Sequence, residues 1–221
     1  MKKTFSLFVM AVLLFMAVRV FAQKHEYVDL GLPSGTLWAT CNVGANAPED
    51  YGDYFAWGET TTKGIYVWDT YKYVGGYDAE MTKYCYDSFY GYKDFTDTLT
   101  TLQMGDDPAA ANWGEGWCIP TKAQWEELLN NTTHQWTTRN GVKGRLFTSK
   151  KNGQSLFMPA AGYRRDDELR DAGSYGYYWS SSLDTISPHR ACDLGFTLDE
   201  CDMETDNRYR GFSVRPVRSS R

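Results

Sequence analysis

The residues of this chain with the clearest chemical potential lie in a carboxylate-rich segment near the carboxyl terminus. Asp202, Glu204 and Asp206 stand at alternate positions, as the first ligands of a calcium-binding loop do, and Ca²⁺ prefers such oxygen ligands. Asn207 stands where that loop needs a glycine, and no glutamate follows at its closing position. Two interpretations are therefore open, a calcium-binding site and an acidic loop exposed to solvent. The missing glycine favours the solvated acidic loop.

Five cysteines are a second source of chemistry. In a secreted chain they allow up to two disulfides and leave one thiol over, and the connectivity cannot be deduced from the sequence. Cys192 and Cys201 flank a short polar segment and are the preferred pair. The alternative is that most of the cysteines are buried as small apolar side chains.

The signatures of common catalytic centres are missing from the sequence. There is no Gly-x-Ser-x-Gly elbow, no His-Glu-x-x-His, no Cys-x-x-Cys and no phosphate-binding loop. The three histidines, His25, His134 and His189, are far apart in the sequence, and we expect surface or capping roles for them rather than general-base catalysis. These absences favour a binding protein over an enzyme.

Aromatic residues precede the acidic segment and indicate recognition by stacking. Tyr177 and Trp179 share one face of a predicted strand while Tyr178 lies on the other, so at least one of these faces is expected to be core. Rings that remain exposed can stack on sugars or anchor a protein partner. We predict one or two exposed rings in this region. Arg215, further on, is expected to bind an acid or backbone carbonyls.

The elements that position these residues begin after an export signal. Lysines open the chain, an apolar run extends from Phe5 to Val18, and a small-residue cleavage site precedes Gln23. The run is shorter than the roughly 20 residues of a membrane-spanning helix. We therefore predict a cleaved signal peptide in residues 1–22 and a single domain in 23–221. This domain would have no transmembrane helix and would lie in the periplasm, on the cell surface or outside the cell.

Charge and composition restrict the partners of the mature chain. Of the 23 basic residues, Lys2, Lys3 and Arg19 precede the cleavage site, whereas all 28 acidic residues follow it, so the mature chain is acidic. Because its basic residues are scattered among acids, we expect no nucleic-acid partner. The aromatic content of 16% is high and fits either tightly packed turns or a stacking surface.

Two helices are predicted from their capping residues. Thr121 and Gln124 form a capping box, in which each side chain satisfies a free N–H at a helix start. Trp125 and Leu128 then share one face of the helix, which we expect to lie against the core. A short helix is also predicted over residues 107–111, with an aspartate cap and a proline in its first position.

Strands are expected for most of the remaining regular structure. Asn-Gly turn signals at 140–141 and 152–153 predict type I′ turns joining three strands. A half-buried strand is predicted within residues 27–43. Residues 64–105 are expected to be a long irregular segment that is either a binding loop or a cover packed over the core, and the packing role is favoured. We predict an α+β fold with few helices, many short antiparallel strands and much loop. The predicted strands are 135–139, 144–150, 155–158, 177–182, 190–198 and 212–217.

Several motifs spread over the mature chain carry a family resemblance. They are Trp38-Ala39-Thr40-Cys41-Asn42-Val43-Gly44, Tyr54-Phe55-Ala56-Trp57-Gly58-Glu59, Trp117-Cys118-Ile119-Pro120-Thr121, Pro159-Ala160-Ala161-Gly162-Tyr163-Arg164, Gly173-Ser174-Tyr175-Gly176-Tyr177-Tyr178-Trp179 and Gly211-Phe212-Ser213-Val214-Arg215-Pro216-Val217. With them the chain resembles the Fibrobacter succinogenes major paralogous domain family. More distantly it resembles formylglycine-generating enzyme (sulfatase-modifying factor) and the variable proteins of diversity-generating retroelements.

The resemblance implies a C-type-lectin-like fold that binds an unknown protein or glycan ligand without catalysis. One alternative is formylglycine-generating activity, but the closely spaced cysteine pair of that enzyme has no match here, because Cys192 and Cys201 stand too far apart. A structural role in a surface assembly is another alternative. No cofactor is expected, apart from calcium in the interpretation given above. The expected ligand-binding residues are Tyr177, Trp179, His189, Arg190, Asp193, Thr197, Asp199, Asp202, Glu204, Asp206 and Arg208.

Overall fold

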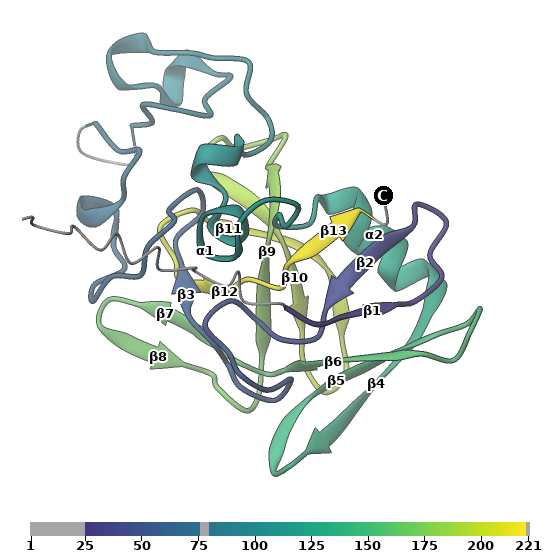
Figure 1. Cartoon of the computed structure of the whole chain (residues 1–221). Helices are drawn as coiled ribbons and strands as arrows, with labels where there is room; N and C mark the ends of the chain where they lie inside the picture. Colours follow the sequence, from purple (N-terminus) through teal and green to yellow (C-terminus); the bar gives the residue numbers. More distant parts are fainter. Residues whose placement is uncertain (1–24, 76–79, 220–221) are drawn as a thin grey trace, which may run out of the picture.

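Short strands account for most of the regular structure. A computed structural model describes residues 25–75 and 80–219, so the predicted signal peptide lies outside the described residues. Within the described part, thirteen strands form four sheets and two α-helices occur, together with four short 3₁₀ helices. This arrangement confirms the predicted α+β class with few helices and mostly strands (Figure 1).

A five-stranded sheet lies at the centre of the fold. Its strands, in spatial order, are β11 (Cys201–Asn207), β10 (Arg190–Phe196), β9 (Gly176–Leu183), β12 (Phe212–Ser213) and β3 (Tyr54–Phe55). Neighbouring strands are antiparallel except for β12, which runs parallel to β9. Because β9 and β10 are inner strands, they can be covered on both faces.

Three smaller sheets complete the strand structure. They comprise β1 (Tyr27–Asp29), β2 (Thr36–Ala39) and β13 (Val217–Ser219); β4 (Thr132–Arg139), β5 (Val142–Ser149) and β6 (Ser155–Pro159); and β7 (Tyr163–Arg165) with β8 (Glu168–Arg170). All of their strand pairs are antiparallel. The pairing of β13 with β2 brings the last described residues of the chain beside one of its first strands (Figure 1).

The first of the two predicted tight turns is confirmed. Asn140 and Gly141 both have positive φ, 47° and 84°, as a two-residue type I′ turn between β4 and β5 requires. The second turn differs, because β5 ends at Ser149 and β6 begins at Ser155. Only Gly153 has positive φ in that longer connection, so the Asn-Gly pair there does not form a type I′ turn.

The longer helix, α2 (Lys122–Asn131), begins as its capping residues predict. The Thr121 hydroxyl accepts from the Gln124 backbone N–H at 3.2 Å, and the Gln124 side chain accepts from the Thr121 N–H at 2.9 Å. Trp125 is fully buried, and its indole donates to the backbone carbonyl of Trp179 at 3.3 Å. The helix is therefore fixed to β9 through one of its core side chains.

The short helix α1 (Pro108–Trp113) also confirms its prediction. The Asp107 side chain accepts from the backbone N–H groups of Ala109 and Ala110, which caps the helix as expected. Before it lies the irregular segment of residues 64–105, whose described part carries buried aromatic residues and short 3₁₀ helices. The 3₁₀ helices are η1 (Trp68–Thr70), η2 (Ser88–Tyr90), η3 (Tyr92–Asp94) and η4 (Met104–Asp106).

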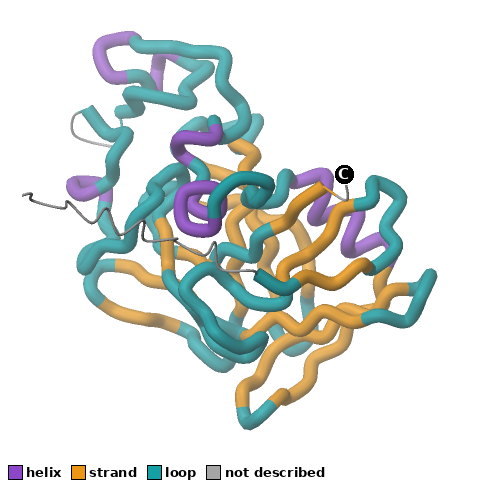
Figure 2. Tube along the Cα trace, in the orientation of Figure 1, coloured by secondary structure: helices purple, strands orange, loops and turns teal. Residues whose placement is uncertain are grey.

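Burial on both faces of the sheets overturns the expected half-buried strand within residues 27–43 and the predicted ligand-binding role of Trp179. All four residues of β2 are buried, so this strand is not half exposed, and Trp38 packs 4.6 Å from the Trp125 ring. On β9, Tyr178 and Trp179 point to opposite faces and both are fully buried. The loops in Figure 2 cover much of the sheet structure, which leaves few exposed positions on the inner strands.

Candidate functional site

The acidic segment forms a strand instead of a loop. Cys201–Asn207 is β11, paired with β10 along its whole length, so Asp202, Glu204 and Asp206 project from one face of the sheet edge. Both the calcium-loop interpretation and the solvated-loop interpretation are therefore wrong about its local structure. Alternate residues on a strand lie about 6.6 Å apart, which spreads the three carboxylates instead of converging them.

Asp193 lies on β10, beside the row of carboxylates on β11. It is opposite Glu204 in the β10–β11 ladder and its exposure is 0%. Neither of its carboxylate oxygens has a hydrogen-bond partner among the described residues. Burial, and then the charges of Asp206 and Glu204, raise the pKa of Asp193 well above its ordinary value. The prediction that Asp193 is an outward-facing ligand residue is therefore corrected, since it is a buried acid whose charged form is disfavoured.

Glu204 lies above a glycine of the neighbouring strand. A Cβ at Gly195 would come within 2.6 Å of the Glu204 carboxylate carbon, so the missing side chain makes room for this carboxylate. Glu204 is exposed, and no hydrogen bond or ion pair to it is recorded among the described residues. Partial desolvation and then Asp206 raise its pKa above the ordinary value. Across the sheet, Gly195 is opposite Tyr177 on β9.

Three tyrosine rings border these carboxylates. The rings of Tyr175 and Tyr177 are parallel with their centroids 5.9 Å apart, and Tyr163 meets Tyr177 edge-on at 5.4 Å. Tyr175 is exposed, whereas Tyr177 and Tyr163 are half-buried. We call the surface formed by Tyr163, Tyr175, Tyr177, Asp193, Glu204, Asp206 and Arg210 the tyrosine–carboxylate face.

Arg210 is the cation of this face. It donates to the Asp206 carboxylate, and its guanidinium carbon lies 5.1 Å from the centre of the Tyr163 ring. Despite this partner, burial raises the pKa of Asp206 above its ordinary value. The ligand-binding residues predicted from the sequence did not include Tyr163, Tyr175 and Arg210. The spacing of these residues in the chain does not show that the β7–β8 hairpin, which carries Tyr163, lies beside β9 and β11.

Two predicted ligand residues belong to the core. Trp179 is fully buried, donates to the Phe55 carbonyl at 2.8 Å and stacks on Phe212 with ring centroids 4.2 Å apart. Arg208 is fully buried as well, although it was predicted to be a ligand-binding residue. The alternation of β11 ends before Arg208, and the chain there turns inward beneath the irregular segment.

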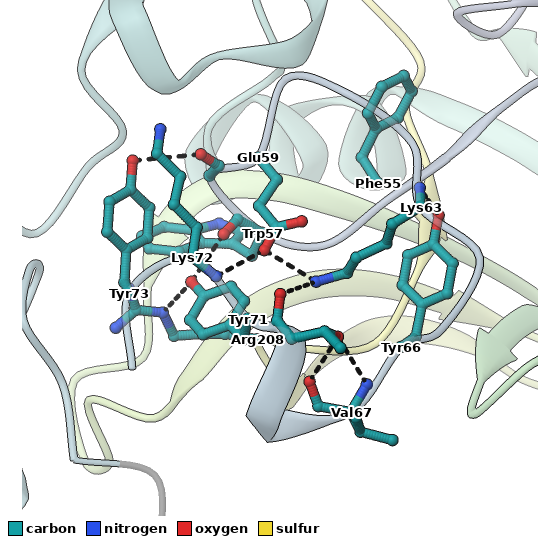
Figure 3. Close-up of polar contacts among 12 residues, drawn as sticks. Phe55, Trp57, Glu59, Lys63, Tyr66, Val67, Tyr71, Lys72, Tyr73 and Arg208 are labelled. Carbon is teal, nitrogen blue, oxygen red and sulfur yellow. Dashed lines mark hydrogen bonds and ion pairs between the residues drawn. The ribbon is translucent and has the colours of Figure 1, made fainter. Parts of the chain in front are cut away.

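Arg208 fastens the irregular segment to the sheet (Figure 3). Its guanidinium carbon lies 4.8 Å from the Trp57 ring centre, and its Nε donates to the Tyr71 hydroxyl at 2.8 Å. Further N–H groups donate to the backbone carbonyls of Lys83, at 3.0 Å, and Pro188, at 2.8 Å. The packing role expected for residues 64–105 therefore holds in their described part.

Arg215 confirms the carbonyl-binding alternative. It is fully buried and donates to the carbonyls of Ala39, at 3.1 Å, and Thr40, at 2.6 Å. Its Nε donates to the side chain of Asn42 at 2.8 Å. Like Arg208, it binds the chain's own backbone, which makes it a structural residue.

The other predicted ligand residues are divided between the two ends of β10. His189 and Arg190 lie at its start, where the His189 ring bonds the Ser187 hydroxyl at 3.2 Å. Thr197 and Asp199 lie beyond its end, where the Thr197 hydroxyl accepts the Asp199 N–H at 3.2 Å. A seven-residue strand spans about 20 Å, so these pairs cannot contact one small ligand together.

The expected disulfide is wrong. Cys192 is opposite Thr205 and Cys201 is opposite Phe196, four residues further along β10, and both cysteines are free. That offset is about 13 Å along the strand, beyond the reach of an S–S bond. Burial raises the pKa of the Cys192 thiol to about 11 and that of Cys201 to about 12. Both behave as the small apolar side chains of the alternative interpretation.

A groove of about 520 Å³ lies elsewhere, between α2 and the edge of the central sheet. Its lining includes Thr121, Lys122, Glu126, Ser182, Cys192 and Thr205. Since Cys192 and Thr205 alternate with Asp193 and Glu204 along their strands, this groove opens on the opposite face of β10 and β11. It provides an independent position for control substitutions.

No cluster of three or more His, Cys, Asp or Glu residues suited to a metal ion occurs within residues 25–75 and 80–219, which argues against the weak calcium candidates Asp202, Glu204 and Asp206. Over the same ranges, no helix is long and apolar enough to cross a membrane. The candidate site consists of tyrosine rings and carboxylates at the edge of the central sheet. Comparison of the chain with protein-family models, with curated proteins and with solved structures gives no match in any of the three.

Proposed function

We propose that this chain is an exported, non-enzymatic binding or adhesion domain whose tyrosine–carboxylate face recognises a protein or glycan ligand. The scaffold we propose is of the C-type-lectin type, with the binding face near the carboxyl terminus. The observation that carries the proposal is the grouping of the stacked Tyr175 and Tyr177 rings with Glu204, which is paired across the ladder with Asp193, a buried acid without a hydrogen-bond partner among the described residues.

The energetic cost of this arrangement supports a functional role. Leaving a buried polar group unsatisfied costs about 1–3 kcal/mol, so native proteins contain few such groups. Here an unpaired acid, Asp193, lies next to two further carboxylates, Glu204 and Asp206. Local departures from stable packing are characteristic of functional sites, where the cost is retained because a ligand interaction requires it.

The rings support recognition of a macromolecular ligand. Tyrosine offers a large amphipathic contact area with few rotatable bonds, so little conformational entropy is lost when it binds. Tyr177 is held between Tyr163 and Phe212, at ring distances of 5.4 and 5.0 Å, and it supports the more exposed Tyr175. The face therefore presents pre-oriented rings beside charged groups.

The environment of the thiols and histidines supports the absence of catalysis. The cysteine pair that a formylglycine-generating activity would need is separated along β10, and both thiols have raised pKa values. The ring of His134 bonds Arg145 at 2.8 Å, and that of His189 bonds Ser187. These side chains take part in local packing and lie away from the tyrosine–carboxylate face.

The proposal is tested by probing glycan and protein arrays with the mature chain and two single variants. Tyr175→Ala removes the exposed ring of the face, whereas Glu126→Gln changes the separate groove on the opposite side of the sheet. We expect Tyr175→Ala to abolish the strongest array signals and Glu126→Gln to leave them unchanged. Signals that survive Tyr175→Ala but disappear with Glu126→Gln would place binding in the groove and contradict the proposal.

A further inference from the structure

The charges of the tyrosine–carboxylate face identify the chemical class of its ligand. We propose that the face binds a lysine or arginine side chain of a partner protein, with Glu204 and Asp193 facing the cationic head and Tyr175 and Tyr177 packing on its aliphatic stem. This inference rests on the proposed function and narrows it to one kind of ligand group.

The carboxylates of the face outnumber its cations. Arg210 pairs with Asp206, whereas Asp193 and Glu204 have no hydrogen bond or ion pair recorded among the described residues. Directly opposed residues of antiparallel strands have Cβ atoms about 5 Å apart, so one cationic group can approach both acids. A basic side chain would supply the ion-pair partner that Glu204, and Asp193 once it ionises, do not have among the described residues.

The face already contains one example of the proposed interaction. The guanidinium of Arg210 is bonded to Asp206 and lies over the ring of Tyr163 at 5.1 Å. Glu204 and Tyr177 form a second combination of carboxylate and aromatic ring on the same face. In this second combination the cation is missing, because none of the cation–ring contacts of the described residues involves Tyr175 or Tyr177. Carboxylate and ring together favour a cation over a neutral group.

Glu204 is the accessible acid of this pair, because it is exposed whereas Asp193 is buried. Its carboxylate lies over Gly195, where a Cβ would come within 2.6 Å of the carboxylate carbon. An incoming cation would therefore contact Glu204 directly, and contact with Asp193 would require the side chains around that acid to move.

Protonation of the acids gives the interaction a defined pH dependence. The pKa values of Asp193 and Glu204 are raised in the free protein, so both acids hold protons at pH values where ordinary carboxyls are ionised. A cation stabilises the ionised forms, and binding must therefore release protons and strengthen as the pH rises. The other groups that act on these acids or on Tyr177 are Tyr163, Asp171, Glu200, Asp202, Asp206 and Arg210.

Calorimetric titration of the mature chain with short capped peptides tests the proposal. The probes are Gly-Lys-Gly, Gly-Arg-Gly and the uncharged Gly-norleucine-Gly, with glucosamine and glucose as a second cationic and neutral pair. We expect the lysine and arginine peptides to bind, the norleucine peptide not to bind, and glucosamine to bind less tightly because it has no extended stem. Equal binding of the charged and norleucine peptides would overturn the proposal. Binding of glucosamine without binding of either charged peptide would show that the cationic group does not come from a protein side chain.

Variants distinguish this inference from the proposed function. Glu204→Gln should weaken peptide binding by about tenfold or more, since hydrogen bonds to charged groups contribute that much. Glu126→Gln removes one charge elsewhere and should have no effect. An array ligand that is lost with Tyr175→Ala but retained with Glu204→Gln would contradict the cationic ligand while leaving the binding face intact. A ligand indifferent to both substitutions would contradict both proposals.

Discussion

Asp193 lies directly opposite Glu204 in the β10–β11 ladder, which places a buried carboxyl group beneath an exposed one on the same face of the sheet. Like charges at opposed positions destabilise a strand pair. Burial and these neighbours raise the pKa of Asp193 well above its ordinary value, so its ionised form is disfavoured in the folded protein. The same pair gives the candidate site its polar character.

Replacing Asp193 with asparagine should stabilise the protein at neutral pH. The unfolded chain releases the Asp193 proton above a pKa of about 3.9, whereas the folded chain keeps it, so ionisation favours unfolding as the pH rises from this value towards the raised pKa. Asp193→Asn removes the penalty and adds an N–H donor. We expect a gain of about 1–3 kcal/mol at pH 7 and almost none near pH 3, measured by urea unfolding. A variant less stable than the native chain at pH 7 would contradict this assignment.

Replacing Arg208 should destabilise the whole domain. Arg208→Met leaves the carbonyls of Lys83 and Pro188 without their donors and removes the cation from the aromatic cluster around Trp57. Each buried unsatisfied group costs about 1–3 kcal/mol, so we expect a loss of about 3 kcal/mol or more in urea unfolding. Arg190→Met, at an exposed position, is the matched control. Equal stabilities of the two variants would show that Arg208 does not fasten the irregular segment.

His134 should make the protein less stable in weak acid. Its Nδ1 accepts from the Arg145 guanidinium at 2.8 Å, and burial and then this positive charge lower the pKa of His134. The unfolded chain therefore takes up a proton below about pH 6.5 that the folded chain resists, and stability falls as the pH drops through this range. His134→Gln should reduce the loss of Tm between pH 7 and pH 5. If the variant loses as much Tm between pH 7 and pH 5 as the native chain, His134 is not the source of the acid sensitivity, and His25 or His189 becomes the candidate.

The cysteines should be independent of redox conditions. The five thiols are free, and the ladder separates Cys192 from Cys201 by four residues along β10. We expect Tm to be the same with and without a reducing agent, and mass spectrometry after denaturing alkylation to find five modified cysteines in the unreduced protein. A lower Tm on reduction, together with fewer modified cysteines, would demonstrate a disulfide and contradict the register.

Local interactions made parts of this fold predictable from sequence. The capping box of Thr121 and Gln124, the Asp107 cap and the Asn140-Gly141 turn depend on residues close together in the chain, and all three are confirmed. Strand β11 was missed because aspartate and glutamate are uncommon in strands, and only Cys201 and Met203 make its other face apolar. It forms a strand because pairing with β10 outweighs the low β-propensity of its acidic residues.

The candidate site was only partly predictable. Tyr177, Glu204 and Asp206 were all among the predicted ligand-binding residues, and the structure brings them to one face of the central sheet because each alternates to that face of its strand. The burial of Trp179 and Arg208 depends on the irregular segment folding over the sheet, and no periodic pattern encodes that contact. Tertiary packing therefore decides which residues of a correctly placed segment reach the solvent.

The central claim is that the tyrosine–carboxylate face binds a basic side chain. The most direct measurement compares the affinity of the lysine peptide for Glu204→Gln and Glu126→Gln, two variants with the same change of charge on opposite faces of the sheet. We predict an affinity about tenfold or more below that of the native chain for Glu204→Gln, and the native affinity for Glu126→Gln. Native affinity in Glu204→Gln, or an equal loss in both variants, would contradict the account.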